Sequence, residues 1–218
     1  MPGAFPNAPG ASILRCVATL TRMDLLDPDV RNVVDDEIVG TNFCGEQIDD
    51  KVIEDCTFRE CRFVGAVLTD CRFVTCTFED CDLSGVVLSG VALHEVRFLR
   101  CKLRGVDFAE AFSLRLPEFE ECMLDEAGYV GVALPGLKLE KCSAREACFQ
   151  DAKLQRANFR GTDLHGALFS GADLRKADLR DAKDYVIDPR VTRVEGARAS
   201  LPEAAAMLIA LGVRLDDM

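Results

Sequence analysis

A five-residue period runs through most of this 218-residue chain and restricts its fold more than any other feature. An apolar residue returns at every fifth position from Phe43 to Phe108 and, after a shift of one residue, small or apolar residues continue the series from Leu114 to Leu179. We call the residue at each fifth position the centre of its repeat unit. Two positions before most centres lies a second small or apolar residue, usually Cys or Val in the first half and Ala in the last third. The other positions are mostly charged residues, Ser or Gly.

This period fits neither the 3.6 residues of an α-helix nor the 2.0 of a flat strand. It predicts a chain that turns a corner every five residues and points two of each five side chains inward. Four such sides close a coil of about twenty residues, and coils stack at the roughly 4.8 Å spacing of paired strands. The 28 units in the sequence therefore predict an all-β solenoid of about seven coils over residues 41–186.

The repeat units resemble a known sequence family. Ala157–Gly161, Ala172–Lys176 and Ala177–Asp181 are similar to the A-[DN]-[LF]-x-x signature of the pentapeptide-repeat proteins. The resemblance covers about residues 41–186 and implies a right-handed quadrilateral parallel β-helix. The charged residues Glu46 and Lys51 occupy inward positions, so we expect the first coil to be incomplete or distorted.

The segments outside the repeats are expected to cover the solenoid ends, which would otherwise expose unpaired strand edges. Residues 1–40 are expected to form an N-terminal segment and possible cap. Within residues 187–218, Ser200 and Glu203 are spaced as a capping box at the start of a helix over residues 204–211. Gly212 suits the end of that helix, and residues 213–215 could form a short strand.

The predicted C-terminal helix is apolar on all sides. One face can cap the last coil, and the other must be buried elsewhere. This predicts a short C-terminal α-helix that also forms a symmetric homodimer. The candidate interface residues are Leu201, Met207, Leu208 and Leu211.

The one-residue shift of the period lies within Ala109–Ser113. It is expected to bulge one corner of the coil and to place Phe112 and Pro117 at inward positions. The bulge is either a tolerated irregularity or a recognition loop.

Eleven cysteines raise the possibility of a metal or redox site. Eight of them fall on the inward position two before a centre: Cys56, Cys61, Cys71, Cys76, Cys81, Cys101, Cys122 and Cys142. Zinc sites usually pair cysteines two to four residues apart, whereas here neighbours lie five apart on different sides of the coil. Buried thiols in apolar surroundings are inert. We therefore favour packing over a thiol-rich metal or redox site, expect no metal or cofactor, and expect a reducing compartment such as the cytoplasm.

The sequence shows no sign of catalysis. Its two histidines form no nucleophile–histidine arrangement, and no phosphate-binding loop or G-x-S-x-G motif is present. No apolar stretch approaches the roughly 18 residues of a membrane helix. We therefore predict a non-catalytic protein.

The net charge of −11 argues against a nucleic-acid binder, whose footprint would be basic. The acidity is concentrated in two segments, with a net −9 over residues 24–55 and a net −6 over residues 106–126. The second segment supplies the candidate partner-binding residues: Asp107, Glu110, Glu118, Glu120, Glu121, Asp125 and Glu126. Carboxylates on a rod can compete for the Lys and Arg that normally neutralise phosphates, but they can also serve solubility alone.

A repeat rod followed by an apolar helix resembles the Qnr and MfpA branch of the family. That resemblance implies a DNA mimic that binds DNA gyrase or topoisomerase IV and protects it from poisons such as quinolones. It also implies dimerisation through the C-terminus. The alternative is a scaffold or interaction module with a different protein partner, because the fold alone does not fix a function.

Overall fold

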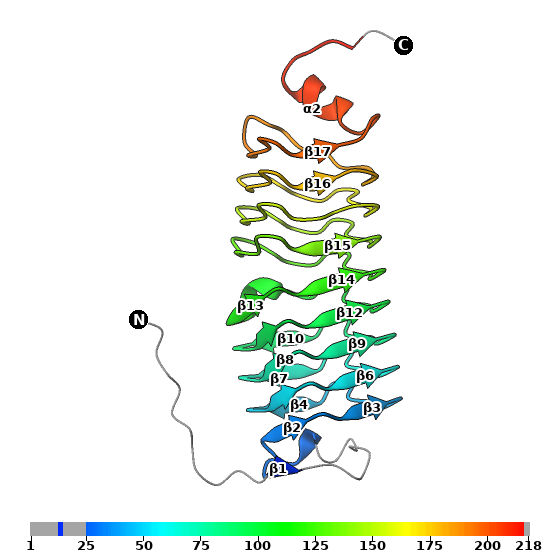
Figure 1. Ribbon diagram of the computed structural model, residues 1–218, viewed down its shortest axis with the longest axis vertical. Helices are drawn as coiled ribbons and strands as arrows, with labels where there is room; N and C mark the ends of the chain where they lie inside the picture. Colours follow the sequence, from blue (N-terminus) through cyan, green and yellow to red (C-terminus); the bar gives the residue numbers. More distant parts are fainter. Residues whose placement is uncertain (1–12, 15–24, 216–218) are drawn as a thin grey trace, which may run out of the picture.

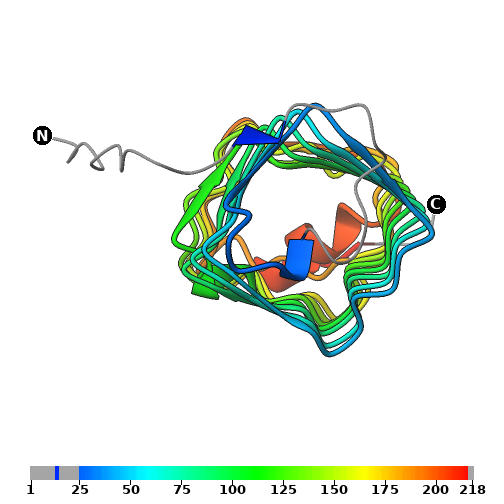
Figure 2. The same cartoon turned by 90° about the horizontal axis from the view of Figure 1, so that it is seen from below.

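The computed structural model describes residues 13–14 and 25–215, which form a parallel β-solenoid of about eight coils (Figure 1). Viewed along the axis, the coils superimpose on one four-sided outline (Figure 2). The expected right-handed quadrilateral β-helix is confirmed. Among the described residues, no helix is long and apolar enough to cross a membrane.

The four faces of the solenoid are called A to D in the order in which the chain passes through them. Face A contains β1 (Ile13–Leu14), β2 (Asn32–Val34), β5 (Val52–Glu54), β8 (Arg72–Val74), β11 (Ala92–His94) and β13 (Ser113–Arg115). Face B contains β3 (Glu37–Val39), β6 (Thr57–Arg59), β9 (Thr77–Glu79), β12 (Arg97–Leu99), β14 (Glu118–Glu120), β15 (Lys138–Glu140), β16 (Asp178–Leu179) and β17 (Arg198–Ala199). Face C is held by single bridges such as Asn42↔Arg62, and face D contains β4 (Gln47–Asp49), β7 (Val67–Thr69) and β10 (Val87–Ser89).

The five-residue period produces this shape because each short strand buries its central side chain and the chain then turns. On face B the buried rings of Phe58, Phe78 and Phe98 stack with centroids 4.7 and 5.1 Å apart. Corner residues such as Asp55 (φ 54°) and Gly85 (φ 64°) adopt the left-handed conformation. Gly adopts this conformation without steric cost and Asp more readily than most residues, which explains their recurrence at corners.

The solenoid begins earlier than residue 41, the expected boundary. β2 pairs with β5, and β3 pairs with β6, both in the regular twenty-residue register. The expected distortion of the first coil is also wrong, because buried Val33 and Ile38 continue the inward series. Lys51 is buried and its Nζ donates hydrogen bonds to the carbonyl oxygens of Asp27 and Val30. The inward charge therefore closes the N-terminal end of the solenoid, and burial lowers the pKa of this lysine.

The solenoid also continues past residue 186. Asp173 pairs with Arg193, and β16 pairs with β17, each twenty residues further along the chain. Ile187 and Thr192 are buried in this additional coil. The earlier start and the later end together explain why there are about eight coils instead of seven.

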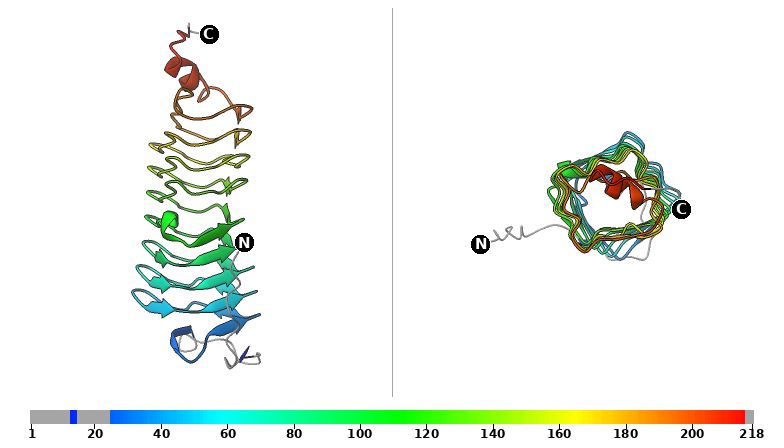
Figure 3. Two further views of the ribbon diagram at one scale, coloured as in Figure 1. Left: turned by 90° about the vertical axis from the view of Figure 1, so that its left-hand side faces the viewer. Right: turned by 90° about the horizontal axis from the view of Figure 1, so that it is seen from above.

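Helix α2 (Ala205–Ala210) lies across the C-terminal end of the solenoid (Figure 3). The predicted capping box does not form, because the side-chain oxygen of Ser200 accepts a hydrogen bond from the N–H of Asp181 and the N-cap residue is Ala204. Gly212 follows the helix with a φ of 86°, as expected. Residues 213–215 form no strand.

The insertion lies where the sequence placed it, since Ala92 on β11 pairs with Ser113 on β13, 21 residues later. The short 3₁₀-helix η1 (Phe108–Glu110) absorbs the extra residue. Pro117 is buried as expected, but Phe112 points outward and half-buried Ala111 packs against the core. The inward position two before a centre usually holds Cys, Ala or Val, and a phenyl ring is larger than these.

Candidate protein-binding surfaces

The seven acidic residues predicted in the middle of the rod do not form one patch. They are distributed over three faces and their corners: Glu118 and Glu120 on face B, Asp125 on face C, Asp107 on face D, and Glu110, Glu121 and Glu126 at or next to corners. The structure thus brings only some of them together. Sequence proximity misleads here because five residues along the chain lead to a different face.

Bases on neighbouring coils neutralise several of these carboxylates. Glu118 forms an ion pair with Lys138 (2.5 Å) and contacts Arg97 (3.6 Å). Glu126 pairs with Arg104 (2.5 Å), and Glu121 pairs with Lys141 (3.7 Å).

The other four mid-rod acids have no ion pair among the described residues. Asp125 accepts hydrogen bonds from the Ser143 hydroxyl and the Arg145 backbone N–H. Asp107 caps η1 by accepting from the N–H of Ala109. For Glu110 and Glu120, the part of the chain that the structure describes supplies no basic partner.

The N-terminal coils carry the stronger acidic surface. Residues 27–60 contain eleven acids and three bases, a net charge of −8. One of the three bases, Lys51, is buried beneath the surface. These 34 residues occupy about 1.7 coils, or roughly 8 Å of the axis at the strand spacing. Double-stranded DNA carries about five charges over that length, so this band, which we call the acidic N-terminal band, reaches the charge density of DNA.

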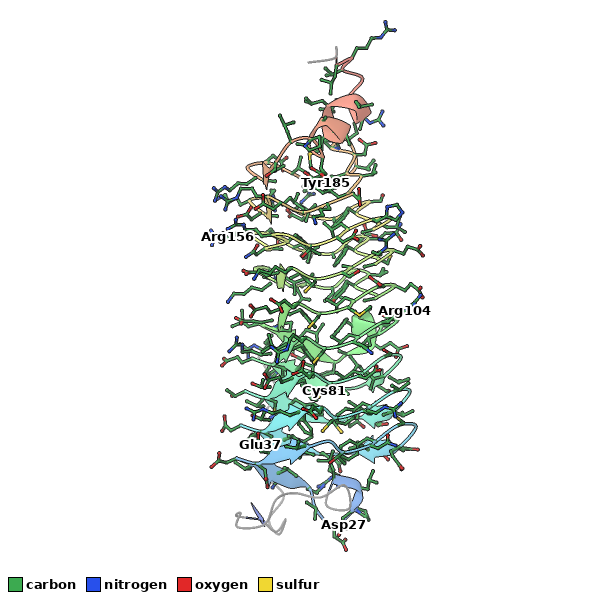
Figure 4. The ribbon with its side chains drawn as sticks, turned by 90° about the vertical axis from the view of Figure 1, so that its right-hand side faces the viewer. Asp27, Glu37, Cys81, Arg104, Arg156 and Tyr185 are labelled. Carbon is green, nitrogen blue, oxygen red and sulfur yellow. The ribbon has the colours of Figure 1, made fainter. Side chains whose placement is uncertain are left out.

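The C-terminal coils have the opposite sign. Residues 141–200 carry twelve bases and nine acids. Here Asp–x–Arg pairs recur, with Arg175 bound to Asp173 at 2.5 Å and Arg180 bound to Asp178 at 2.5 Å. The hydrogen bond from Arg175 is the main cause that holds the pKa of the buried Asp173 carboxyl well below its usual range. The rod is therefore acidic at the end marked by Asp27 and Glu37 in Figure 4 and weakly basic around Arg156.

The cysteine ladder is part of the core. All eight inward cysteines are at most 4% exposed, which confirms the expected packing. Cys81, labelled in Figure 4, points into the solenoid and its thiol donates to the carbonyl oxygens of Phe58 and Glu79. Burial raises the pKa of the Cys76 thiol to about 12. No group of His, Cys, Asp and Glu within residues 25–215 is arranged to hold a metal ion.

An exposed apolar patch lies at the C-terminal end. Of the four residues predicted there, Leu201, Leu208 and Leu211 are exposed. Met207 instead packs against the core and anchors α2 to the last coil. Ile209 and Val213 are also exposed and extend this C-terminal patch.

Comparison with sequence families gives two matches. A model of the pentapeptide repeat region matches residues 51–128, and a model of eight pentapeptide repeats matches residues 134–183. No curated protein matches the chain.

Solved structures with a similar fold include two proteins of different roles. HetL, a pentapeptide repeat protein involved in heterocyst differentiation regulation in the cyanobacterium Nostoc sp. strain PCC 7120, is 22% identical with a TM-score of 0.66. That match covers 78% of this chain and 87% of HetL. A trypsin-treated variant of QnrB1, a plasmid-mediated fluoroquinolone resistance protein, is 22% identical, with a TM-score of 0.53 and coverage of 86% of this chain and 99% of that chain. At these identities the likeness shows the fold.

Proposed function

Because this chain belongs to the pentapeptide-repeat family, we propose that it is a non-catalytic rod that binds a type II topoisomerase through its carboxylates. The partner would be DNA gyrase or topoisomerase IV. The rod would occupy the surface that normally holds DNA and so protect the enzyme from poisons such as quinolones. The role of QnrB1 in fluoroquinolone resistance supports this choice of partner.

The observation that carries the proposal is the charge density of the acidic N-terminal band. A surface shaped to hold DNA presents Lys and Arg that neutralise phosphates. A narrow rod with a DNA-like charge per unit length can satisfy the same side chains. The mid-rod acids Asp107, Glu110 and Glu120 have no basic partner among the described residues and add separate negative charges nearer the centre of the rod.

We further propose that the C-terminal patch forms a homodimer. Two copies would then present two acidic bands at opposite ends of a longer rod, which suits a partner with two-fold symmetry. The same proposal places the protein in the cytoplasm, without direct nucleic-acid or membrane contact.

The test is a gyrase supercoiling and cleavage assay with and without a quinolone. The protein should inhibit supercoiling, reduce quinolone-stabilised cleavage, and lose both effects as salt rises. Absence of inhibition and of protection at micromolar protein would overturn the proposal and favour a scaffold with another partner.

Corner aspartates provide a matched pair of variants. Asp35→Asn with Asp55→Asn neutralises two exposed charges of the acidic N-terminal band, and Asn tolerates their left-handed backbone. Each exposed ionic contact contributes about 0.7 kcal/mol to the binding free energy. This variant should therefore bind gyrase about tenfold more weakly and need about tenfold more protein for the same protection. The control, Asp151→Asn with Asp181→Asn, removes two corner charges of the same conformation from the C-terminal coils and should protect normally.

A further inference from the structure

The backbone ladder of the solenoid is broken at one place on face A. Elsewhere on this face each coil donates to the next, as in the bonds from Glu95 to Arg115 (2.8 Å) and from Gly136 to Gln155 (2.8 Å). Between β13 and residues 132–136 the described chain has no such bond, although faces B, C and D continue through the same coils.

The ladder break leaves backbone groups unpaired on both of its edges. The N–H groups of Leu114, Leu116 and Ala133 have no acceptor among the described residues. Pro135, on the facing coil, has no N–H to donate. Free groups of this kind are what an added strand pairs with.

Apolar side chains surround the ladder break. Phe112 is 71% exposed, whereas the other eleven described phenylalanines are buried. Leu116 and Val130 are also exposed beside it. An open depression of about 290 Å³ is lined by residues 108–109, 111–114 and 130–133. In Figure 3 the ribbon of η1 stands at the edge of the stack at this level.

The charged residues around the ladder break are mainly acidic. Glu95 and Glu110 are exposed and have no ion pair among the residues that the structure describes, and Asp107 lies next to η1. Two cations lie nearby on face A: Arg115 on β13 itself, and exposed Lys153, which is bridged to Ala133 on the facing coil. A ligand that fits this surface carries a free backbone, an apolar side chain and positive charge.

We propose that the ladder break is the docking site for an extended, cationic segment of the protein partner. The segment pairs its backbone with the free edge at Leu114 and Leu116 and covers Phe112 with an apolar side chain. A helix has no free backbone for these groups, and a nucleic acid is repelled by the surrounding acids. This inference rests on the proposed function, because the partner is the same topoisomerase that the acidic N-terminal band engages.

The chain has no tryptophan, so Phe112→Trp introduces a single reporter at the ladder break. Its emission should shift to the blue when the DNA gyrase heterotetramer is added. Val186→Trp is the matched control, since Val186 is equally exposed (74%) but lies in the last coil. Its emission should not change. Amide hydrogen exchange at Leu114 and Leu116 should be fast in the free protein and slow in the complex.

Phe112→Ser removes the exposed ring without touching the core and should weaken gyrase protection about 10- to 30-fold. The variant's thermal unfolding should match that of the unmodified protein. If Phe112→Ser protects normally and the Phe112→Trp emission is unchanged by gyrase, the docking site is refuted while the proposed function stands. If the unmodified protein neither inhibits nor protects gyrase, both the docking site and the proposed function are refuted.

Discussion

The ring of Phe98 stacks on that of Phe119 with centroids 5.0 Å apart and planes 7° from parallel, although 21 residues separate them. The insertion between them therefore leaves the core of face B undisturbed. Its effects lie on face A, where Phe112 points to solvent, Leu114 is only half-buried and the backbone ladder is interrupted. An insertion in a repeat can thus change one face and leave the stacked core of another face intact, because each coil contacts only its neighbours.

Replacing Tyr129 by Phe should stabilise the protein. Its ring stacks between Phe108 and Phe149, and its buried hydroxyl has no hydrogen-bond partner among the described residues. An unsatisfied buried polar group costs about 1–3 kcal/mol. We expect Tyr129→Phe to recover about 1 kcal/mol, measured as an increase in Tm of roughly 2–4 °C. The opposite substitution at the neighbouring ring, Phe149→Tyr, adds a buried hydroxyl and should lower Tm. An increase in Tm would contradict this account.

Most thiols of the native protein should be unreactive. Burial raises the pKa of Cys56 to about 11 and that of Cys76 to about 12, which leaves little thiolate at pH 8. Half-buried Cys44 and Cys148 should react with a thiol reagent before unfolding, together with Cys16, which lies outside the described residues. Titration of more than about three fast thiols would refute the buried ladder.

Stability should fall in acid partly through Asp173. The hydrogen bond from Arg175 lowers the pKa of this buried carboxyl in the folded state below the value of about 3.9 in the unfolded chain. A lowered pKa gives stability that is complete above about pH 4 and is lost as the pH falls towards the folded-state value. Asp173→Asn should therefore be less stable at pH 7 and show a weaker decrease between pH 4 and 2, measured by denaturant unfolding. If Asp173→Asn leaves the dependence of the unfolding free energy on pH unchanged, the Asp173–Arg175 pair contributes nothing to stability.

The C-terminal patch should control the oligomeric state. Leu208→Asp with Leu211→Asp places charges on the exposed side of α2 and at its C-cap, where they would be desolvated in a dimer. Sedimentation should show a dimer for the unmodified protein and a monomer for this variant. The control Val39→Asp changes an equally exposed apolar residue at the other end and should stay dimeric. A monomer for the unmodified protein would remove the dimer from the proposal.

The amino-acid sequence alone specifies the architecture, because a small or apolar residue returns at almost every inward position with a period of five, which fits neither a helix nor a flat strand. Phe58, Phe78 and Phe98 could be assigned to one stack, and Cys61 and Cys81 to the core, from spacing alone. The limits of the solenoid were harder to predict. Lys51 breaks the apolar pattern at an inward position, yet its ammonium group donates hydrogen bonds to the backbone carbonyls of Asp27 and Val30.

The character of the surfaces depends on how the coils stack. Glu118 and Glu121 read as free acids in the sequence, but their partners Lys138 and Lys141 are one coil away, twenty residues along the chain. The direction of Phe112 followed from the size limit of an inward position, and the ladder break followed from how two coils of unequal length meet. The period specifies which side chains point inward, whereas charge pairing and free backbone edges depend on contacts between coils.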